Sequence, residues 1–130
     1  MAPAAALLER SDLADGCREL AASPFADDAQ VARYAVAALI DEAELTPKPA
    51  LVDQRGSGAH RDLDLATMRR SACALEPTFA ALARAARRRG EPSALLRTEL
   101  AQIGRAGEQQ MLRATGGSNA HRGAIWIIGL

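Results

Sequence analysis

The sequence predicts an all-α protein, and three observations support this fold class. The chain has 130 residues, of which 48% are hydrophobic but only 3% aromatic, so its core must be built from Ala, Leu, Ile and Val. Ala and Leu are the strongest helix formers. Apolar residues recur at helical spacing, and alternating β-branched runs are absent from the sequence. We expect one domain over residues 1–130 with about five or six helices.

Capping signals mark where the helices begin and end. Asp27 or Asp28 suits the start of the second helix, because an N-cap carboxylate accepts a backbone N–H. Asp62 is the expected cap of the third helix, Pro77 fits the first turn of the fourth, and Gly90 is its expected C-terminal stop. Helices are expected over residues 4–22, 29–45, 62–75, 77–89, 93–115 and 120–130.

Two features within these helices need a structural explanation. Arg87–Arg89 end the fourth helix, and a solvated helix end that complements the dipole is favoured over a phosphate patch. Gly104 and Gly107 lie inside the fifth helix, where each costs about 1 kcal/mol relative to Ala. Close approach of a neighbouring helix is the expected reason for them.

Charge and cysteine content narrow the class of protein. The charges of sixteen basic and sixteen acidic residues cancel, so we do not expect the protein to bind nucleic acid through its net charge. Cys17 and Cys73 lack metal-site spacing and fit a reducing cytoplasm. The N-terminus lacks signal-peptide features, and the longest apolar run, residues 123–130, is too short to span a membrane. The chain ends inside that run, so we expect an incomplete C-terminus and self-association through this apolar end.

The segment 42–64 interrupts the helices with Pro47, Pro49, two glycines and a dense group of ionisable residues. Its Gly56–Arg61 stretch, GSGAHR, matches residues 117–122, GSNAHR, at five of six positions, and the two stretches hold both histidines of the chain. A Gly/Ser turn before a helix presents backbone N–H groups to an anion. Both turns are ordinary helix caps, or together they form a polyanion site; the repeat favours the second interpretation.

The same residues carry a family resemblance. LTPKPALVDQRGSGAHRDLD (45–64), SACALEPTF (71–79) and IGRAGEQQMLRATGGSNAHRGAIWIIGL (103–130) are similar, in this order, to the motifs of triphosphoribosyl-dephospho-CoA synthases. The resemblance covers residues 42–130, and the chain would correspond to the N-terminal half of such an enzyme. Ala50 stands where the family usually has glycine, Gln54–Ser57 replaces a segment that commonly carries asparagine, and Leu63 replaces a common methionine.

The resemblance implies an all-helical transferase with ATP and 3′-dephospho-CoA as substrates. The ribose 2′-hydroxyl of dephospho-CoA would attack the anomeric carbon of the ATP ribose, adenine would leave, and the triphosphate would stay on the product. That product is the prosthetic-group precursor of citrate lyase or malonate decarboxylase, which a separate transferase passes to an acyl carrier protein. Such a site needs cations for the triphosphate, a base, a donor for adenine, and Mg²⁺ held by carboxylates.

Residue types then suggest roles at each position. The catalytic candidates, which can move a proton or stabilise positive charge, are His60, Asp62 and His121. The candidate substrate contacts are Lys48, Arg55, Gly58, Asn119 and Arg122. The candidate Mg²⁺ ligands are Asp53, Asp62 and Asp64. Glu42 and Glu108 are weaker candidates, because both are expected on helices where a carboxylate is commonly only solvated.

Two other classes of function remain open from the sequence. One is a Mg²⁺-dependent helical nucleotide phosphohydrolase, although such sites repeat carboxylates at helical spacing and the acids here cluster at loop ends. The other is an inactive helical fragment that acts only by binding a partner.

Overall fold

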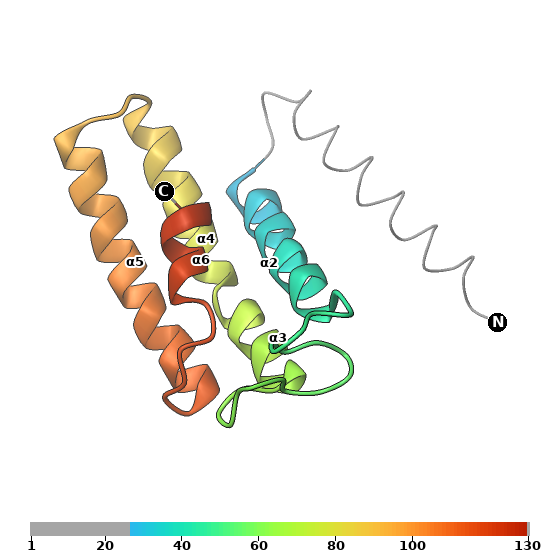
Figure 1. The fold of residues 1–130 in the computed structure, drawn as a ribbon. Coiled ribbons are helices and arrows are strands. Elements are labelled where there is room, and N and C mark those ends of the chain that lie inside the picture. Colours follow the sequence, from blue (N-terminus) through green and yellow to red (C-terminus); the bar gives the residue numbers. More distant parts are fainter. Residues whose placement is uncertain (1–26, 130) are drawn as a thin grey trace, which may run out of the picture.

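The computed structural model describes residues 27–129, and this part of the chain is all-α, as expected (Figure 1). It holds four helices of ten residues or more and one short helix of seven. These are α2 (Asp28–Glu44), α3 (Leu65–Ala74), α4 (Glu76–Arg89), α5 (Ala94–Thr115) and the short α6 (Arg122–Ile128). The helix expected over residues 4–22 lies outside the described residues.

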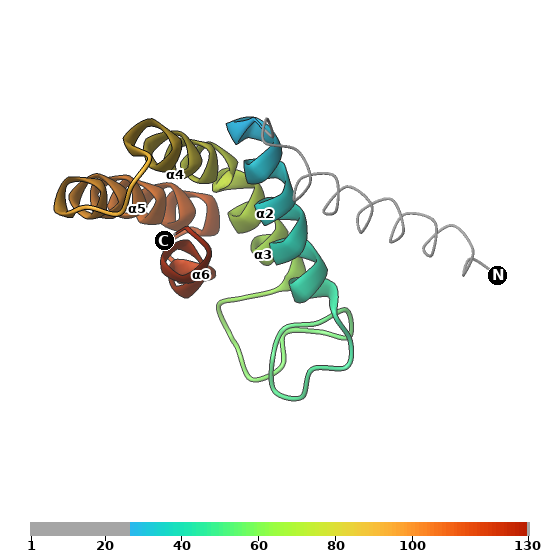
Figure 2. The same cartoon turned by 90° about the horizontal axis from the view of Figure 1, so that it is seen from above.

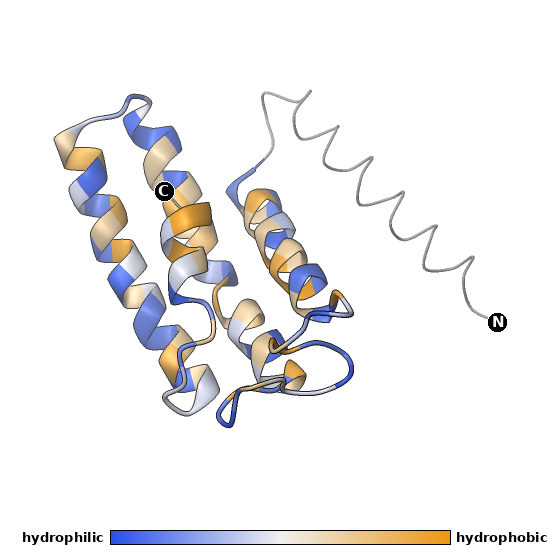
Figure 3. Cartoon of the chain, viewed as in Figure 1, coloured by the Kyte–Doolittle hydropathy of each residue, from blue (hydrophilic) through white to orange (hydrophobic). Residues whose placement is uncertain are grey.

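The helices pack as a small bundle in which α4 and α5 run side by side and α2 lies against α4 (Figure 1). Leu75 ends α3 and begins α4, and it is fully buried. The buried residues of α2 are Ala32, Val36, Leu39 and Ala43, at the three- and four-residue spacing of one helix face. Figure 3 shows hydrophobic and hydrophilic residues alternating along the helices, as this one-sided burial requires.

Helix caps follow the sequence signals with one correction. Asp27 begins α2 with a capping box, because its carboxylate accepts from the Gln30 N–H and the Gln30 side chain accepts from the Asp27 N–H. The cap of α3 is Asp64, not Asp62: its Oδ1 accepts from the Thr67 N–H at 2.7 Å. Leu63 is buried in front of the helix, which places the residue after it at the cap.

The end of α4 is fastened by ion pairs. Gly90 ends the helix in the left-handed conformation, as expected. Arg88 and Arg89 both pair with Glu99 on α5, and Arg87 pairs with Asp28 on α2. The arginine run therefore joins α4 to α2 and α5 through ion pairs. These contacts do not favour the alternative of a phosphate-binding patch.

Close helix packing explains the two glycines of α5. A Cβ added to Gly107 would lie 2.5 Å from Cγ2 of Thr78 on α4, and one added to Gly104 would lie 3.3 Å from the Trp126 ring of α6. In α6, Ile125 is buried, whereas Ile127 is 83% exposed and Ile128 48%. None of the helices between residues 27 and 129 has the length and apolar character needed to cross a membrane.

The connection between α2 and α3, residues 45–64, is the longest one in the described chain. Figure 2 shows it projecting from one side of the bundle, beyond the end of α2. It contains most of the residues that the sequence suggested for a functional site, so its internal structure decides how those residues are presented.

Candidate functional site

Asp53 organises this connection from inside. Its side chain is 2% exposed, and its carboxylate accepts from the backbone N–H of Lys48 at 2.8 Å and of Arg55 at 2.7 Å. The Arg55 guanidinium adds a bond at 2.9 Å. The Lys48 backbone bond, followed by the Arg55 side chain, lowers the pKa of Asp53 to about 2. Asp53 is thus charged at neutral pH and holds the loop together, with Arg55 as its ion-pair partner.

Gly58 and Ala50 meet where the loop crosses itself. The Ala59 N–H donates to the Ala50 carbonyl at 3.0 Å, and both Ala50 and Gly58 have positive φ, of 64° and 58°. A Cβ on Gly58 would lie 2.5 Å from the backbone carbon and oxygen of Ala50. Gly58, suggested as a substrate contact, therefore has a packing role. The left-handed Ala50 also explains why glycine is expected at that position.

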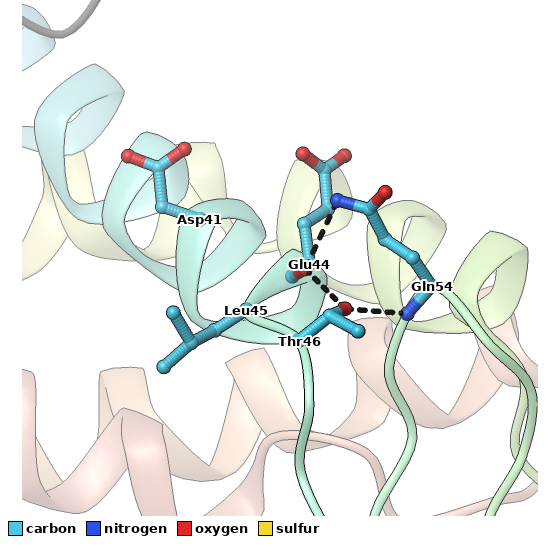
Figure 4. A pocket seen from close by; sticks show the side chains of 5 residues that line it. All are labelled: Asp41, Glu44, Leu45, Thr46 and Gln54. Atoms are coloured by element: carbon cyan, nitrogen blue, oxygen red, sulfur yellow. Dashed lines mark hydrogen bonds between the residues drawn. The ribbon is translucent and has the colours of Figure 1, made fainter.

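The start of the loop is tied to the end of α2 (Figure 4). The Glu44 carbonyl accepts from Thr46 Oγ1 at 2.9 Å and from Gln54 Nε2 at 3.1 Å, and the Gln54 N–H donates to Thr46 Oγ1 at 3.1 Å. The Glu44 carboxylate accepts from Arg69 of α3. Glu44, Thr46 and Gln54 line a pocket together with Asp41 and Leu45. None of the suggested site residues lines this pocket.

A second pocket, which we call the central pocket, brings the two repeated turns together. It lies between the loop, α2, α3 and the turn before α6. Its lining residues are Glu42, Lys48, Leu51, Val52, His60, Leu63, Met68, Asn119 and Ala120. We expected the two turns to form one site. His60 from the first turn and Asn119 from the second both line this pocket. Lys48 Nζ is held at the pocket by the Glu42 carbonyl at 2.6 Å and the Glu42 carboxylate at 3.0 Å.

His121 is not at the surface of this pocket but buried beside it. It is 5% exposed, its Nδ1 lies 2.7 Å from the Ser71 hydroxyl of α3, and its backbone N–H donates to the Met111 sulfur. Its Nε2 has no hydrogen-bond partner among the described residues. Burial lowers the pKa of His121, and the nearby Glu42 charge acts in the opposite direction. An imidazole held neutral in this way is a poor direct partner for a polyphosphate.

The remaining residues of the second turn have structural partners. Asn119 Oδ1 accepts from the N–H of Arg122, the first residue of α6, at 3.1 Å. Arg122 Nε lies 3.0 Å from Glu108 on α5, and the same carboxylate oxygen accepts from Trp126 Nε1 at 3.2 Å. Arg122 and Glu108 therefore join α5 to α6, and neither lines the central pocket.

The suggested Mg²⁺ ligands, Asp53, Asp62 and Asp64, have different surroundings in the structure. Among residues 27–129, no group of three or more His, Cys, Asp or Glu side chains is placed to hold a metal ion. Asp53 is saturated by N–H donors, Asp64 caps α3, and Asp62 is exposed on the loop. Two of the three acids therefore accept local hydrogen bonds from backbone N–H groups.

Sequence reasoning missed Ser71. It is completely buried in α3 and makes its hydrogen bond to His121, fifty residues further along the chain. The available signal was a serine between Arg70 and Ala72 in a helix, which is too common to single out.

The sequence motifs on this all-α fold define a protein family. The chain belongs to the ATP:dephospho-CoA triphosphoribosyl transferase family, whose model matches residues 28–130. No solved structure matches the chain.

Several curated proteins share these residues. A probable 2-(5''-triphosphoribosyl)-3'-dephosphocoenzyme-A synthase of Azotobacter vinelandii is 63% identical over 99 residues, which is 76% of this chain and 34% of that protein. The corresponding protein of Pseudomonas aeruginosa is 59% identical over 85% of this chain and 38% of its own length. The synthase of Klebsiella pneumoniae is 59% identical over 77% of this chain and 35% of its own. The matched residues therefore span about a third of the length of these relatives.

Proposed function

We propose that this chain supplies a nucleotide-binding part of a triphosphoribosyl-dephospho-CoA synthase, with the central pocket as its site. The observation that carries the proposal is that His60 and Asn119, from the two repeated turns, line one cavity together with Lys48. The family match gives the chemistry that such a cavity would serve. A cation, an imidazole and an amide in a cavity that apolar side chains also line suit a ligand that has both a phosphate chain and a base.

The proposed reaction transfers the triphosphoribosyl group of ATP to 3′-dephospho-CoA. The bond between the anomeric carbon and adenine breaks, and its electron pair leaves with adenine. The 2′-hydroxyl oxygen of dephospho-CoA forms the new bond to that carbon. A base takes the hydroxyl proton and adenine gains one, so that the net proton movement is from the hydroxyl to the leaving base.

Residues of this chain can be assigned to parts of that reaction. Lys48, whose side chain is 12% exposed and already held by Glu42, would contact phosphate oxygens. His60, which is exposed and lines the pocket, would take a proton from a bound hydroxyl. The apolar side chains of Val52, Leu63 and Met68 would pack against a base. No group of three or more metal-ligating side chains is placed together among residues 27–129, and no step of the proposal uses Mg²⁺.

We further propose that the product serves as the prosthetic-group precursor of citrate lyase or malonate decarboxylase. A separate transferase would then attach it to an acyl carrier protein, in the cytoplasm. This assignment rests on the family alone.

The binding part of the proposal is tested on the 130-residue chain by nuclear magnetic resonance titration with ATP and with 3′-dephospho-CoA. Both should shift the resonances of Lys48, His60 and Asn119. Lys48→Met should weaken ATP binding about tenfold or more, since hydrogen bonds to charged groups are worth about 1.5–3 kcal/mol. Arg105→Met on the exposed side of α5 is the matched control. Shifts confined to other surfaces, or equal effects of the two variants, would contradict the proposal.

The reaction itself is tested in a protein of family length that carries this segment. Free adenine should appear from ATP only when 3′-dephospho-CoA is present. Release of ADP would support the phosphohydrolase alternative, which the lack of an acidic cluster in the described chain disfavours. No turnover together with no nucleotide binding would support the inactive fragment.

A further inference from the structure

The loop between α2 and α3 has a second cavity, which we call the loop pocket. All of its lining residues lie between Lys48 and Gly58, and they include Asp53 and Arg55. Lys48 and Leu51 line both the loop pocket and the central pocket, so the two cavities are neighbours. Each has a volume of about 220 Å³. Pockets for small molecules typically measure about 300–1,000 Å³. Either cavity alone is below this range, whereas the two together lie within it.

Lys48 extends from one cavity to the other. Its backbone N–H donates to Asp53, which lines the loop pocket, at 2.8 Å. Its Nζ is bonded to the carbonyl and the carboxylate of Glu42, which lines the central pocket. A chain-like ligand that contacts the Lys48 ammonium group in the central pocket would therefore lie at the boundary of the loop pocket.

Arg55 gives the loop pocket a cationic group with a fixed orientation. Its Nε donates to Asp53 Oδ2 at 2.9 Å, and its Nη2 lies 2.9 Å from the same oxygen. The side chain is nevertheless 59% exposed and makes no other hydrogen bond among residues 27–129. A guanidinium carries five N–H groups, and Asp53 takes at most two of them. The remaining edge, with Nη1 and the second N–H of Nη2, matches two oxygens of a phosphate group.

The charges of the loop pocket favour an anion. Asp53 is its acidic residue, but this carboxylate is 2% exposed and accepts from the backbone N–H groups of Lys48 and Arg55 as well as from the guanidinium. The charge that a ligand meets is therefore that of Arg55, which repels cations and attracts anions. The anionic part of a nucleotide is its phosphate chain, and the proposed function already places part of that chain at Lys48.

We propose that the loop pocket binds the distal phosphates of ATP through Arg55, with Asp53 as the positioning residue that holds the guanidinium. The base and the sugar then occupy the central pocket, and Lys48 contacts the chain where it passes between the cavities. The inference rests on the proposed function, because it extends the same ligand into a second cavity. Since the distal phosphates are remote from the anomeric carbon, Arg55 should affect nucleotide affinity more than the bond-breaking step.

The test compares AMP and ATP, which differ in the distal phosphates, by calorimetric titration of the 130-residue chain. Arg55→Met should weaken ATP binding about five- to tenfold, a modest loss because water screens a half-exposed contact. It should leave AMP binding unchanged. Arg55→Lys, which keeps the charge and loses the fork, should lie between Arg55→Met and wild type. The matched control is Arg69→Met. Arg69 is 49% exposed, pairs with Glu44 and lines neither cavity, so this variant should bind ATP like wild type.

The comparison with AMP separates ligand binding from a purely structural role. Leu51, Val52 and His60 of the same loop line the central pocket, so a loop that loosens without Arg55 would weaken AMP and ATP alike. Equal weakening of both, or unchanged ATP binding, would overturn the proposal. Titration with 3′-dephospho-CoA tests the other nucleotide substrate: a loss confined to it would overturn the assignment to ATP. If wild type bound neither AMP nor ATP, the proposed function itself would fail, and this inference with it.

Discussion

Replacing Gly58 by alanine should damage the candidate site through the loop's own backbone. The new Cβ would lie 2.5 Å from the carbon and oxygen of Ala50 and 2.6 Å from the Leu51 carbonyl oxygen. Favourable contacts between non-bonded heavy atoms lie near 3.5–4.0 Å, so the two crossing segments of the loop would have to separate by about 1 Å. The atoms in the way are backbone atoms, which cannot turn aside as a flexible side chain would.

Two costs contribute to the expected loss of stability. Gly58 has φ of 58°, and a left-handed conformation costs an L-residue about 1–2 kcal/mol. Steric overlap in a packed region typically adds about 1–3 kcal/mol. Opening the loop would relieve the overlap by breaking the bond from Ala59 to Ala50, worth about 0.5–1.5 kcal/mol. We therefore expect Gly58→Ala to lower the free energy of unfolding by about 2–3 kcal/mol and to disorder the loop.

Gly116→Ala separates the two costs. Gly116 has φ of 67°, close to that of Gly58, but a Cβ there would meet nothing within 4 Å. Gly116→Ala should therefore lower the free energy of unfolding only by the cost of the left-handed conformation, about 1–2 kcal/mol. Urea unfolding of both variants measures the difference, and ATP titration should show weaker binding only for Gly58→Ala. Equal stability losses, with nucleotide binding unchanged in both, would refute the close crossing of the loop.

Three further expectations follow from the packing and the charges. Gly107→Ala gains about 1 kcal/mol of helix propensity, but its new methyl group overpacks against Thr78 at a cost of about 1–3 kcal/mol. Thermal unfolding should therefore show a net loss of stability. The control is Gly123→Ala, whose methyl group would meet nothing within 4 Å and should cause no such loss. Because the folded-state pKa of Asp53 is below its usual 3.8, its stabilisation is complete above that value and is lost as pH falls toward about 2; Asp53→Asn should flatten this acid dependence. Burial lowers the pKa of His121 below 6.5, so the unfolded chain binds the proton more readily and stability should fall as pH decreases below that value.

Each of these has an outcome that would contradict it. A more stable Gly107→Ala protein would show that α4 and α5 are not in contact at this point. Acid unfolding with the same profile in Asp53→Asn would mean that the loop is not clamped by that carboxylate. For His121, the control is His121→Gln, which should remove the dependence on pH near neutrality; a variant that keeps the wild-type slope would place the titrating group elsewhere.

The helices were predictable because their signals are local. Periodic apolar residues, Pro77 in a first turn and Gly90 at a helix end act within a few positions of the chain, and the structure agrees with each. The start of α3 was misplaced by two residues. Asp62 and Asp64 are equally good caps in isolation, and burial of Leu63, a tertiary effect, decides between them.

The candidate site was predictable only in part. The repeated turns indicated that the segments of His60 and Asn119 belong together, and both line the central pocket. The sequence could not show that Asp53 is used up by backbone donors five and two residues away. Nor could it show that His121 turns inward to Ser71, because that contact depends on how α3 packs against the turn before α6.

The joint between α5 and α6 gives the chain an internal optical probe. Trp126 is the one tryptophan of the sequence; its ring lies against Gly104, and its indole N–H is bonded to Glu108. Because Glu108 also holds Arg122, the first residue of α6, the indole reports on the anchor of the turn that carries Asn119 and His121. Emission from this single fluorophore can therefore follow the turn whose Asn119 lines the central pocket, in real time and without any label, while nucleotides are mixed with the protein.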